Sequence, residues 1–357
     1  MRGLVYAITL ALIFAVQSSL QAQPAEYYST TEGLTGIELK QVLHEIINDH
    51  SIQSYSSLWT HFQRTDRKED GTVWDIYSDI PGATPPYTYY FINDQCGNYS
   101  AEGDCYNREH SFPKSWFGGE ISPMYTDLFH IYPTDGYVNN RRANWPLGST
   151  DSPDWTSLNG SRVGSSSVSG YSGIVFEPVD EYKGDLARSI LYMAVRYYGE
   201  DASWPVNEMT IGAEPKPWAI VMLLNWHNFD PVSQKEINRN DSVFLIQGNR
   251  NPFIDKPEFV QKIWDSTSGE ESLLTDHYEV AVYPNPSSTL LKVDHRRFIG
   301  TNLKLFISSL TGQILYETDL KQPGLTTINI AEYKPGTYLL ILRGNQISLT
   351  RKFVITR

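Results

Sequence analysis

The sequence changes character at residues 265–278, and this change limits the folds open to the chain. Before it, apolar residues recur at helical spacing in several stretches. The segment 265–278 is polar, and seven short alternating runs separated by Asn-Pro, Thr-Gly and Pro-Gly turns follow it. Such runs predict a small all-β sandwich. We therefore expect an α+β domain over residues 23–264, a linker over 265–278 and a β-sandwich over 279–357.

Residues 1–22 have the pattern of an export signal. Arg2 precedes an apolar run over residues 4–16, and a polar segment then ends at Ala22. The run is too short to span a bilayer comfortably. We predict a cleaved signal peptide and a protein secreted through the periplasm to the medium or the cell surface, with an uncleaved anchor as the alternative. No later stretch of the sequence has the length of a membrane helix, so we expect no membrane span in the mature protein.

The chain has two cysteines, Cys96 and Cys105. Export through an oxidising compartment makes a disulfide between them the default. Closing so short a loop would stabilise the fold by about 2–3 kcal/mol on the chain-entropy estimate. Zinc binding is disfavoured, because no Cys-x-x-Cys or nearby His pair completes a ligand set.

Periodicity and turn residues predict the elements of the first domain. Alternating Tyr, Trp, Val and Ile predict strands within residues 70–92, and a Ser- and Gly-rich stretch predicts an exposed mobile loop over 157–172. Asp185 and Asp230 are expected to cap helices. The expected helices cover residues 35–48, 134–145, 186–198, 218–227, 231–246 and 257–264.

Two segments, residues 104–118 and 127–148, carry the side chains suited to breaking a phosphodiester bond. His110 is the candidate general base, since an imidazole can accept a water proton at neutral pH. Glu109 beside it is the candidate metal ligand. Adjacent strand residues point to opposite faces, so the pair requires the strand to end there, as Ser111-Phe112-Pro113 suggests. The alternatives are a structural His110 and a surface ion pair between Glu109 and Arg108.

The expected helix over residues 134–145 places Asn139 and Arg142 on one face, three residues apart. An amide oxygen is a suitable ligand for Mg²⁺ or Ca²⁺, and a guanidinium can bind a phosphate with two hydrogen bonds. With one carboxylate and one amide, water and substrate must fill most of the coordination shell, as Mg²⁺ prefers. Ca²⁺ or Mn²⁺ is the alternative ion. Spacing alone does not separate Asn139 from Asn140 as the ligand.

The charge distribution counts against nucleic-acid binding. The net charge is −12, but residues 279–357 carry ten basic and five acidic side chains and Arg2 adds one positive charge, so residues 23–278 carry −18. So acidic a body disfavours broad capture of a polyanion. Only a local basic groove would restore binding.

The first domain resembles the secreted endonuclease I family, whose catalytic element is the ββα-metal finger. The matching segments are Asn-Arg-Glu-His-Ser-Phe-Pro at 107–113, Asp127-Leu128 with His130 and Pro133, residues 136–144, residues 183–188, Arg239-Asn240 and residues 247–253. The better-known members are rich in disulfides, whereas this chain has at most one. The segments cover most of the mature chain.

The resemblance implies a role for each site residue. His110 would activate the attacking water, Glu109 and Asn139 would hold Mg²⁺, Arg142 would contact phosphate, and the products would carry a 5′ phosphate. Arg108, Arg188 and Arg250 are further candidates for substrate binding. For Arg188 and Arg250, structural ion pairing is an equal alternative. His130 is expected to fix local structure.

The tail from about Val282 resembles the C-terminal sorting domain of type IX secretion. The matching features are Tyr283-Pro-Asn-Pro, Leu310-Thr-Gly, Pro335-Gly-Thr-Tyr-Leu and the basic pair Arg351-Lys352. The resemblance implies export by that machinery, followed by removal of the domain or its exchange for a surface anchor. A carbohydrate- or surface-binding sandwich is the alternative.

Together these features predict a secreted, Mg²⁺-dependent, largely sequence-nonspecific endonuclease acting on DNA and on RNA as a second candidate substrate. The alternative is a non-catalytic protein that binds nucleic acid or a surface. A metalloprotease is excluded, because the sequence has no His-Glu-x-x-His or comparable ligand set.

Overall fold

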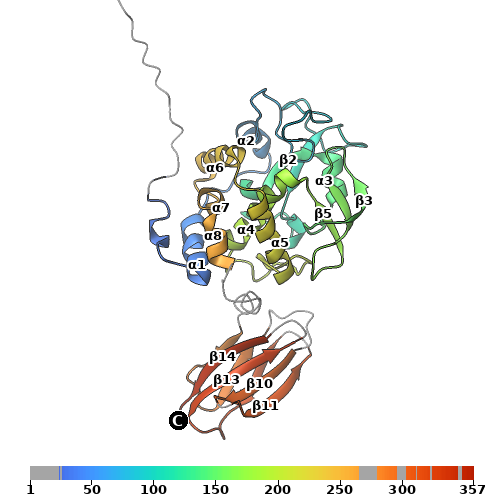
Figure 1. Ribbon diagram of the computed structural model, residues 1–357. Helices are drawn as coiled ribbons and strands as arrows, with labels where there is room; N and C mark the ends of the chain where they lie inside the picture. The colour runs from blue at the N-terminus through green and yellow to red at the C-terminus, as the bar shows by residue number, and fades with distance from the viewer. Residues whose placement is uncertain are drawn as a thin grey trace, which may run out of the picture.

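The computed structural model describes residues 24, 26–264, 280–295, 303–310, 312–321, 324–344 and 348–357. The expected signal peptide and the expected linker lie outside the described residues. Figure 1 shows a helix-rich part, which contains α1 to α8, and an all-β part, which contains β8 to β14. The expected α+β class followed by an all-β region is confirmed.

The helix-rich part contains the helices that the sequence predicts, along with α2 and α7, which it does not. The helices are α1 Gly36–Ile47, α2 Leu58–Thr65, α3 Gly136–Arg142, α4 Lys183–Arg196, α5 Pro217–Phe229, α6 Gln234–Gln247, α7 Pro252–Asp255 and α8 Glu258–Trp264. The strands are β1 Tyr106–His110, β2 Ile131–Asp135, β3 Ser152–Thr156, β4 Arg162–Ser165, β5 Ile174–Glu177, β6 Thr210–Ile211 and β7 Glu214–Pro215. All pairings among these strands are antiparallel.

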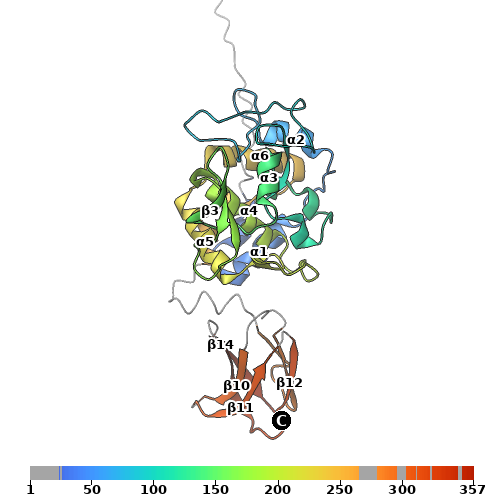
Figure 2. The same cartoon turned by 90° about the vertical axis from the view of Figure 1, so that its right-hand side faces the viewer.

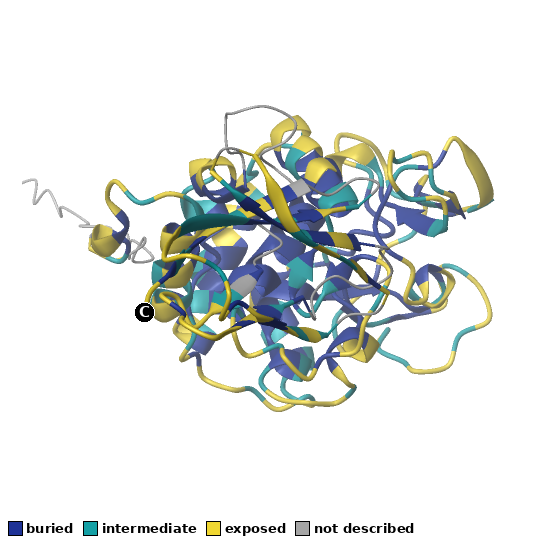
Figure 3. Ribbon diagram, turned by 90° about the horizontal axis from the view of Figure 1, so that it is seen from below, coloured by how far each residue is buried: buried dark blue, intermediate teal, exposed yellow. Residues whose placement is uncertain are grey.

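Helix α4 forms the centre of this domain. Every residue of α4 is buried, and α1, α5 and α7 pack around it. Figure 3 shows the buried residues gathered inside and the exposed ones on the outer faces. A helix buried on all sides must satisfy its polar side chains internally, which explains the many ion pairs described below.

Strands β1 and β2 and helix α3 form a ββα unit. Glu109 pairs with Tyr132 and His110 with Ile131 in the antiparallel register. The Asp135 carboxylate caps α3 by accepting from the Val138 amide at 2.8 Å. Strand β1 ends at His110, at the predicted break. This unit carries the candidate site residues, Glu109 and His110 on β1 and Asn139 and Arg142 on α3.

Two expectations within this domain are wrong. All of residues 70–92 are described, and apart from an isolated bridge at Val73 none of them pairs as a strand. Their aromatic side chains instead bond to distant partners: Trp74 Nε1 donates to the Tyr182 hydroxyl, and the Tyr89 hydroxyl donates to Asp135. Pro81, Pro85 and Pro86 remove the amide donors that a strand would need.

The expected mobile loop at residues 157–172 instead contains β4, the central strand of a three-stranded sheet with β3 and β5. The glycine in β4, Gly164, is required for a steric reason. A Cβ atom on Gly164 would lie 2.6 Å from the Ser152 carbonyl oxygen of β3, so only glycine permits this close approach. The expectation is therefore wrong for residues 162–165, whereas residues 166–172 lie outside strands and are exposed or half-buried.

Two helix starts also differ from the sequence expectation. Helix α4 begins at Lys183, so Asp185 lies inside its first turn and does not cap it. Helix α6 begins at Gln234 after Ser233, which forms a reciprocal capping box with Glu236. Both side chains of that box satisfy free amides at the helix start. Ser233 therefore caps the helix, and Asp230 does not.

The C-terminal part has the predicted runs as strands with its own core. They are β8 Ala281–Tyr283, β9 Leu290–Asp294, β10 Leu303–Ser309, β11 Ile314–Leu320, β12 Leu325–Asn329, β13 Gly336–Arg343 and β14 Ser348–Ile355. They form two sheets in the orders β11-β10-β13-β14 and β12-β9-β8. Among the residues that the structure describes, every helix is too short or too polar to cross a bilayer.

Candidate active site

Glu109 lies on the face of β1 that contacts α3. Its side chain is 3% exposed; the Tyr77 hydroxyl donates to its Oε1 at 3.1 Å, and Arg142 Nε lies 3.3 Å from the same oxygen. Burial raises the pKa of Glu109 to about 7, although Arg142 and Tyr77 act in the opposite direction. The expected alternative, a surface ion pair with Arg108, is therefore wrong.

Asn139 contacts strand β1 at Asn107, two residues before Glu109. Its Nδ2 donates to Asn107 Oδ1 at 2.7 Å, and Asn107 precedes Glu109 by two residues on β1, hence on the same face. Since the amide nitrogen of Asn139 is used, its oxygen is the atom left to accept or to bind a cation. Asn140, in contrast, is exposed.

This pair of oxygen donors fits a hard cation. A buried carboxylate with a raised pKa is stabilised in its charged form by a neighbouring positive charge. Within the described parts of the chain, no three acidic, histidine or cysteine side chains form a metal cluster. Glu109 and Asn139 could hold an ion that binds through few protein ligands.

Arg142 does not face solvent. Its side chain is 1% exposed, Nη2 donates to the Ser111 carbonyl at 2.6 Å, and Nη1 donates to the Ala143 carbonyl at 3.1 Å. With its Nε beside Glu109, the guanidinium holds that carboxylate in place. The structure therefore places Arg142 against Glu109 and two carbonyl oxygens, in contrast to the expected contact with phosphate.

His110 lies against a different set of neighbours. Its Nε2 is 3.1 Å from the carbonyl oxygen of Tyr125, in the short 3-10 helix Met124–Thr126. A carbonyl only accepts, so Nε2 carries the proton and Nδ1 holds the lone pair. Burial, with a smaller effect of His130, lowers the pKa of His110 to about 3. The imidazole is therefore neutral at neutral pH.

Aromatic rings and one guanidinium line the His110 face of β1. The Tyr125 ring stacks on His110 at 5.3 Å and on Tyr55 at 4.3 Å between centroids. The Arg108 guanidinium lies 3.6 Å from the centre of the Tyr55 ring and 4.3 Å from that of Trp59. None of the carboxylates described lies within ion-pair distance of Arg108. Sequence reasoning missed Tyr55 and Tyr125, because the contacts that join them to His110 are tertiary.

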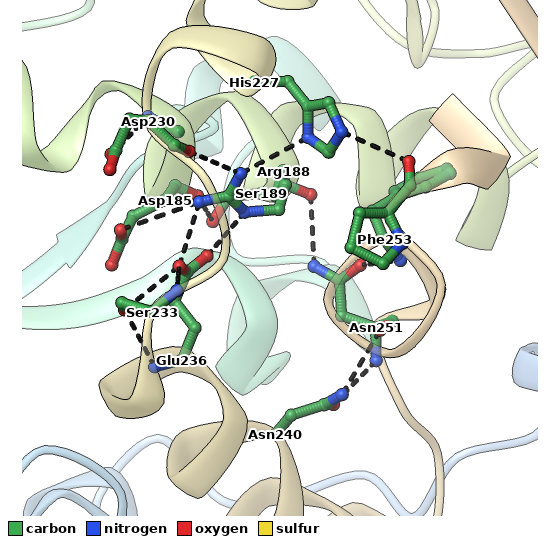
Figure 4. A network of polar contacts seen from close by, with 12 residues as sticks. Asp185, Arg188, Ser189, His227, Asp230, Ser233, Glu236, Asn240, Asn251 and Phe253 are labelled. Carbon is green, nitrogen blue, oxygen red and sulfur yellow. Dashed lines mark hydrogen bonds and ion pairs between the residues drawn. The ribbon is translucent and has the colours of Figure 1, made fainter. Parts of the chain in front are cut away.

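Arg188 and Arg250 belong to the buried framework behind the site. Arg188 donates through Nε and Nη2 to both oxygens of Glu236, at 2.6 and 2.9 Å, and Figure 4 shows this pair with Asp185, His227 and Asp230 around it. Arg250 binds both oxygens of Asp255, at 2.7 and 2.8 Å, and also Asp241. Both arginines therefore form structural ion pairs, and neither makes the expected contact with substrate.

His130 and the cysteines match their structural expectations. His130 is fully buried and its Nε2 donates to the Met124 carbonyl at 2.7 Å, which fixes the segment that carries Tyr125. Cys96 and Cys105 form a disulfide with their Cα atoms 5.7 Å apart. The predicted disulfide is confirmed, and it closes the loop directly before β1.

Comparisons with known proteins agree with this arrangement. The profile of the endonuclease I family matches residues 35–258, and that of the secretion system C-terminal sorting domain matches residues 281–356. An extracellular ribonuclease of Bacillus subtilis (strain 168) is 35% identical over 71% of this chain and 83% of its own length. An extracellular ribonuclease of Bacillus amyloliquefaciens is 36% identical over 68% of this chain and 79% of its own.

A third relative, an endonuclease-1 of Buchnera aphidicola, is 26% identical over 36% of this chain and 46% of its own length. The C-terminal sorting domain and the extracellular relatives show a protein that is secreted or held at the cell surface. The first profile covers more than half of the chain, including β1, β2 and α3. The chain belongs to the endonuclease I family.

Proposed function

We propose that this secreted nuclease is a metal-dependent endonuclease that hydrolyses the phosphodiester bonds of DNA and RNA with little sequence preference. The observation that carries the proposal is the state of His110, whose Nε2–H bonds to the Tyr125 carbonyl and leaves Nδ1 free to accept a proton. Cleavage without base readout needs only contacts to the nucleic-acid backbone. The names of the two ribonuclease relatives support RNA as a substrate.

In the proposed reaction, Nδ1 of His110 takes a proton from water as the water oxygen attacks phosphorus. The bond from phosphorus to the 3′ oxygen breaks, the leaving 3′ oxygen takes a proton from solvent, and the other product carries a 5′ phosphate. The imidazolium formed is stabilised by the Tyr125 carbonyl on one side and by the anionic phosphate on the other. The stacked Tyr125 ring and the Tyr125 carbonyl together hold the imidazole in one orientation.

We also propose that Glu109 and Asn139 hold one Mg²⁺, with Ca²⁺ or Mn²⁺ as the alternative ion. When bound, such an ion stabilises the charge of the phosphorane and of the leaving 3′ oxygen. Arg142 keeps the Glu109 carboxylate oriented, and Asn107 keeps the Asn139 oxygen free. Because strand β1 ends at His110, we propose that a phosphate bound at this end of the strand contacts both the ion and His110.

The test is digestion of DNA and RNA by the purified protein with Mg²⁺, comparing wild type with His110→Ala. Loss of a general base costs about 10²–10⁴ in rate, and we expect that loss with binding of the uncleaved substrate retained. Cleavage by His110→Ala at the wild-type rate would remove His110 from the reaction. A wild-type protein that binds both nucleic acids but cleaves neither would favour the non-catalytic alternative.

A further inference from the structure

Most basic side chains described in the nuclease domain pair with carboxylates, whereas Arg64 on α2 and Arg67, two residues after its end, do not. Lys68 pairs with Asp79 and Arg162 with Glu177, for example. Arg64 and Arg67 are exposed, and no carboxylate of the described residues lies within ion-pair distance of either. On a domain this acidic, two adjacent unpaired guanidiniums are a local site of positive charge.

These two arginines line a pocket of about 560 Å³ between α2 and α6, helices that lie beside each other in Figure 1. Thr60, Gln63 and Arg64 line it from α2, and Arg67 lines it from the segment that follows Thr65, the last residue of the helix. His61 and Gln53 add polar groups, and Leu245 and Ile246 of α6 form the apolar part of the wall. A guanidinium binds a phosphate through paired N–H groups, so the lining suits an anionic phosphate.

A series of side-chain contacts runs from His110 to helix α2, which carries part of the pocket wall. His110 stacks on Tyr125, Tyr125 stacks on Tyr55, and Arg108 lies over both Tyr55 and Trp59. Trp59 is on α2, next to Thr60 in the pocket wall. Arg108, whose Nη1 also donates to the Tyr55 carbonyl at 2.8 Å, therefore lies in the series of contacts between His110 and the helix that carries Arg64.

We propose that the α2 pocket binds a backbone phosphate of the nucleic-acid strand that is cleaved at His110, with Arg64 and Arg67 as its ligands. The proposal rests on the proposed function and specifies how an acidic nuclease holds its polyanionic substrate. Arg108 contacts the strand between the pocket and His110. The rest of the domain surface carries an excess of carboxylates and repels the strand, so the strand binds only along His110, Arg108 and the pocket.

The first experiment measures binding to single-stranded DNA and RNA oligonucleotides in the His110→Ala background at 50–200 mM salt. Each lost phosphate contact lowers the slope of log K against log salt by about 0.7 for a single strand, so Arg64→Gln/Arg67→Gln, which removes both ligands of one phosphate, should lower it by about 0.7. The affinity defect of this variant should then be about threefold larger at 50 mM than at 200 mM salt.

The matched control is Lys256→Gln/Lys262→Gln, which removes the same charge from a second pocket lined by Tyr28 and Phe259. Its salt slope should equal that of the parent. An unchanged slope in the arginine variant would overturn the proposal, as would an equal fall in the control. A pocket that binds free phosphate but not the strand would give an unchanged slope in the arginine variant. Unchanged thermal unfolding of both variants shows that the fold is intact.

The second experiment uses the active protein and two substrates. A remote phosphate is bound equally in ground and transition states, so Arg64→Gln/Arg67→Gln should raise KM for an oligonucleotide and leave kcat within about twofold. A dinucleotide has only the scissile phosphate and should be cleaved equally by both proteins. Slower dinucleotide cleavage by the variant would place the effect at the active site and overturn the proposal. Absence of cleavage by wild type would instead refute the proposed function, while the salt slopes still test the pocket.

Discussion

Asn139 and Asn140 are neighbours in sequence but differ in their surroundings, which allows the metal ligand to be tested at the scale of one residue. Asn139 is held by Asn107 beside Glu109, whereas Asn140 is exposed. We predict that Asn139→Ala raises the Mg²⁺ concentration for half-maximal cleavage by about tenfold or more, since disturbing even outer ligands costs 10–100-fold in metal affinity. Asn140→Ala should leave it unchanged, and a titration of rate against Mg²⁺ measures both.

Glu109 provides the second test at this scale, with a different readout. Glu109→Gln keeps an oxygen that can accept from Tyr77 but removes the charge that a cation requires. We predict cleavage that is abolished or that needs at least tenfold more Mg²⁺, and loss of wild-type activity in EDTA. Full activity of the wild type in EDTA would contradict the metal assignment. The variant also leaves the buried Arg142 without its anion, so its unfolding free energy must be measured alongside.

The sequence shows which residue types are candidates for the site, but it does not show the directions of their side chains. Glu109, His110 and Asn139 carry their chemistry in their side chains, and the spacing on α3 placed Asn139 and Arg142 on one face. The burial of Arg142 depends on the Ser111 and Ala143 carbonyl groups. Those contacts form only when β1 and α3 pack together, so no local pattern reports them.

At the scale of elements, local patterns succeeded where they agreed with packing. The helix at residues 35–48 and the seven β-runs of the tail were predicted because their periodicity matches a buried face. The strands expected at residues 70–92 and the loop expected at 157–172 failed, since single tertiary contacts outweigh composition there. Helix α2 was missed although it carries Trp59, Arg64 and the pocket wall.

The buried network of α4, α5 and α6 predicts a pH dependence of stability. His227 Nδ1 faces Arg188 at 3.3 Å and Nε2 donates to the Pro257 carbonyl, so the ring is neutral. Burial, with a smaller effect of Arg188, lowers the pKa of His227 to about 4. The unfolded chain takes up a proton below about pH 6.5 and the folded protein does not until about pH 4, so acidification favours unfolding by up to about 3 kcal/mol.

The comparison of wild type with His227→Gln isolates this effect, because Asp230 in the same network acts in the opposite sense. Burial raises the pKa of Asp230 to about 7, so its contribution to stability grows as the pH falls. In urea unfolding, the free-energy advantage of wild type over the variant should be larger at pH 7 than at pH 4.5. An advantage that is equal at both values would mean that His227 binds a proton equally in the two states.

At the scale of the whole molecule, charge and packing divide the chain in the same place. The apolar core of the nuclease domain and that of the sorting domain consist of separate residues, the first from Tyr28 to Trp264 and the second from Val280 to Ile355. The sorting domain carries a positive charge of about +5 against the acidic catalytic part. Export and catalysis are thus assigned to regions with their own cores and opposite charge.

This division predicts that a chain ending at Trp264 folds and cleaves like the full mature protein. Each core is complete without the other, and at 150 mM salt the Debye length of about 8 Å screens charges on the sorting domain from a phosphate at His110. We expect kcat/KM within about twofold of the full chain at 150 mM salt and the same thermal midpoint for the nuclease domain. At about 10 mM salt the Debye length grows to about 30 Å, so the truncated protein, having lost positive charge, should associate more slowly with nucleic acid. A tenfold fall in kcat/KM at 150 mM would show instead that the β-sandwich contributes groups to the site, and Arg64, Arg67 and Arg108 would then be only part of the substrate-binding surface.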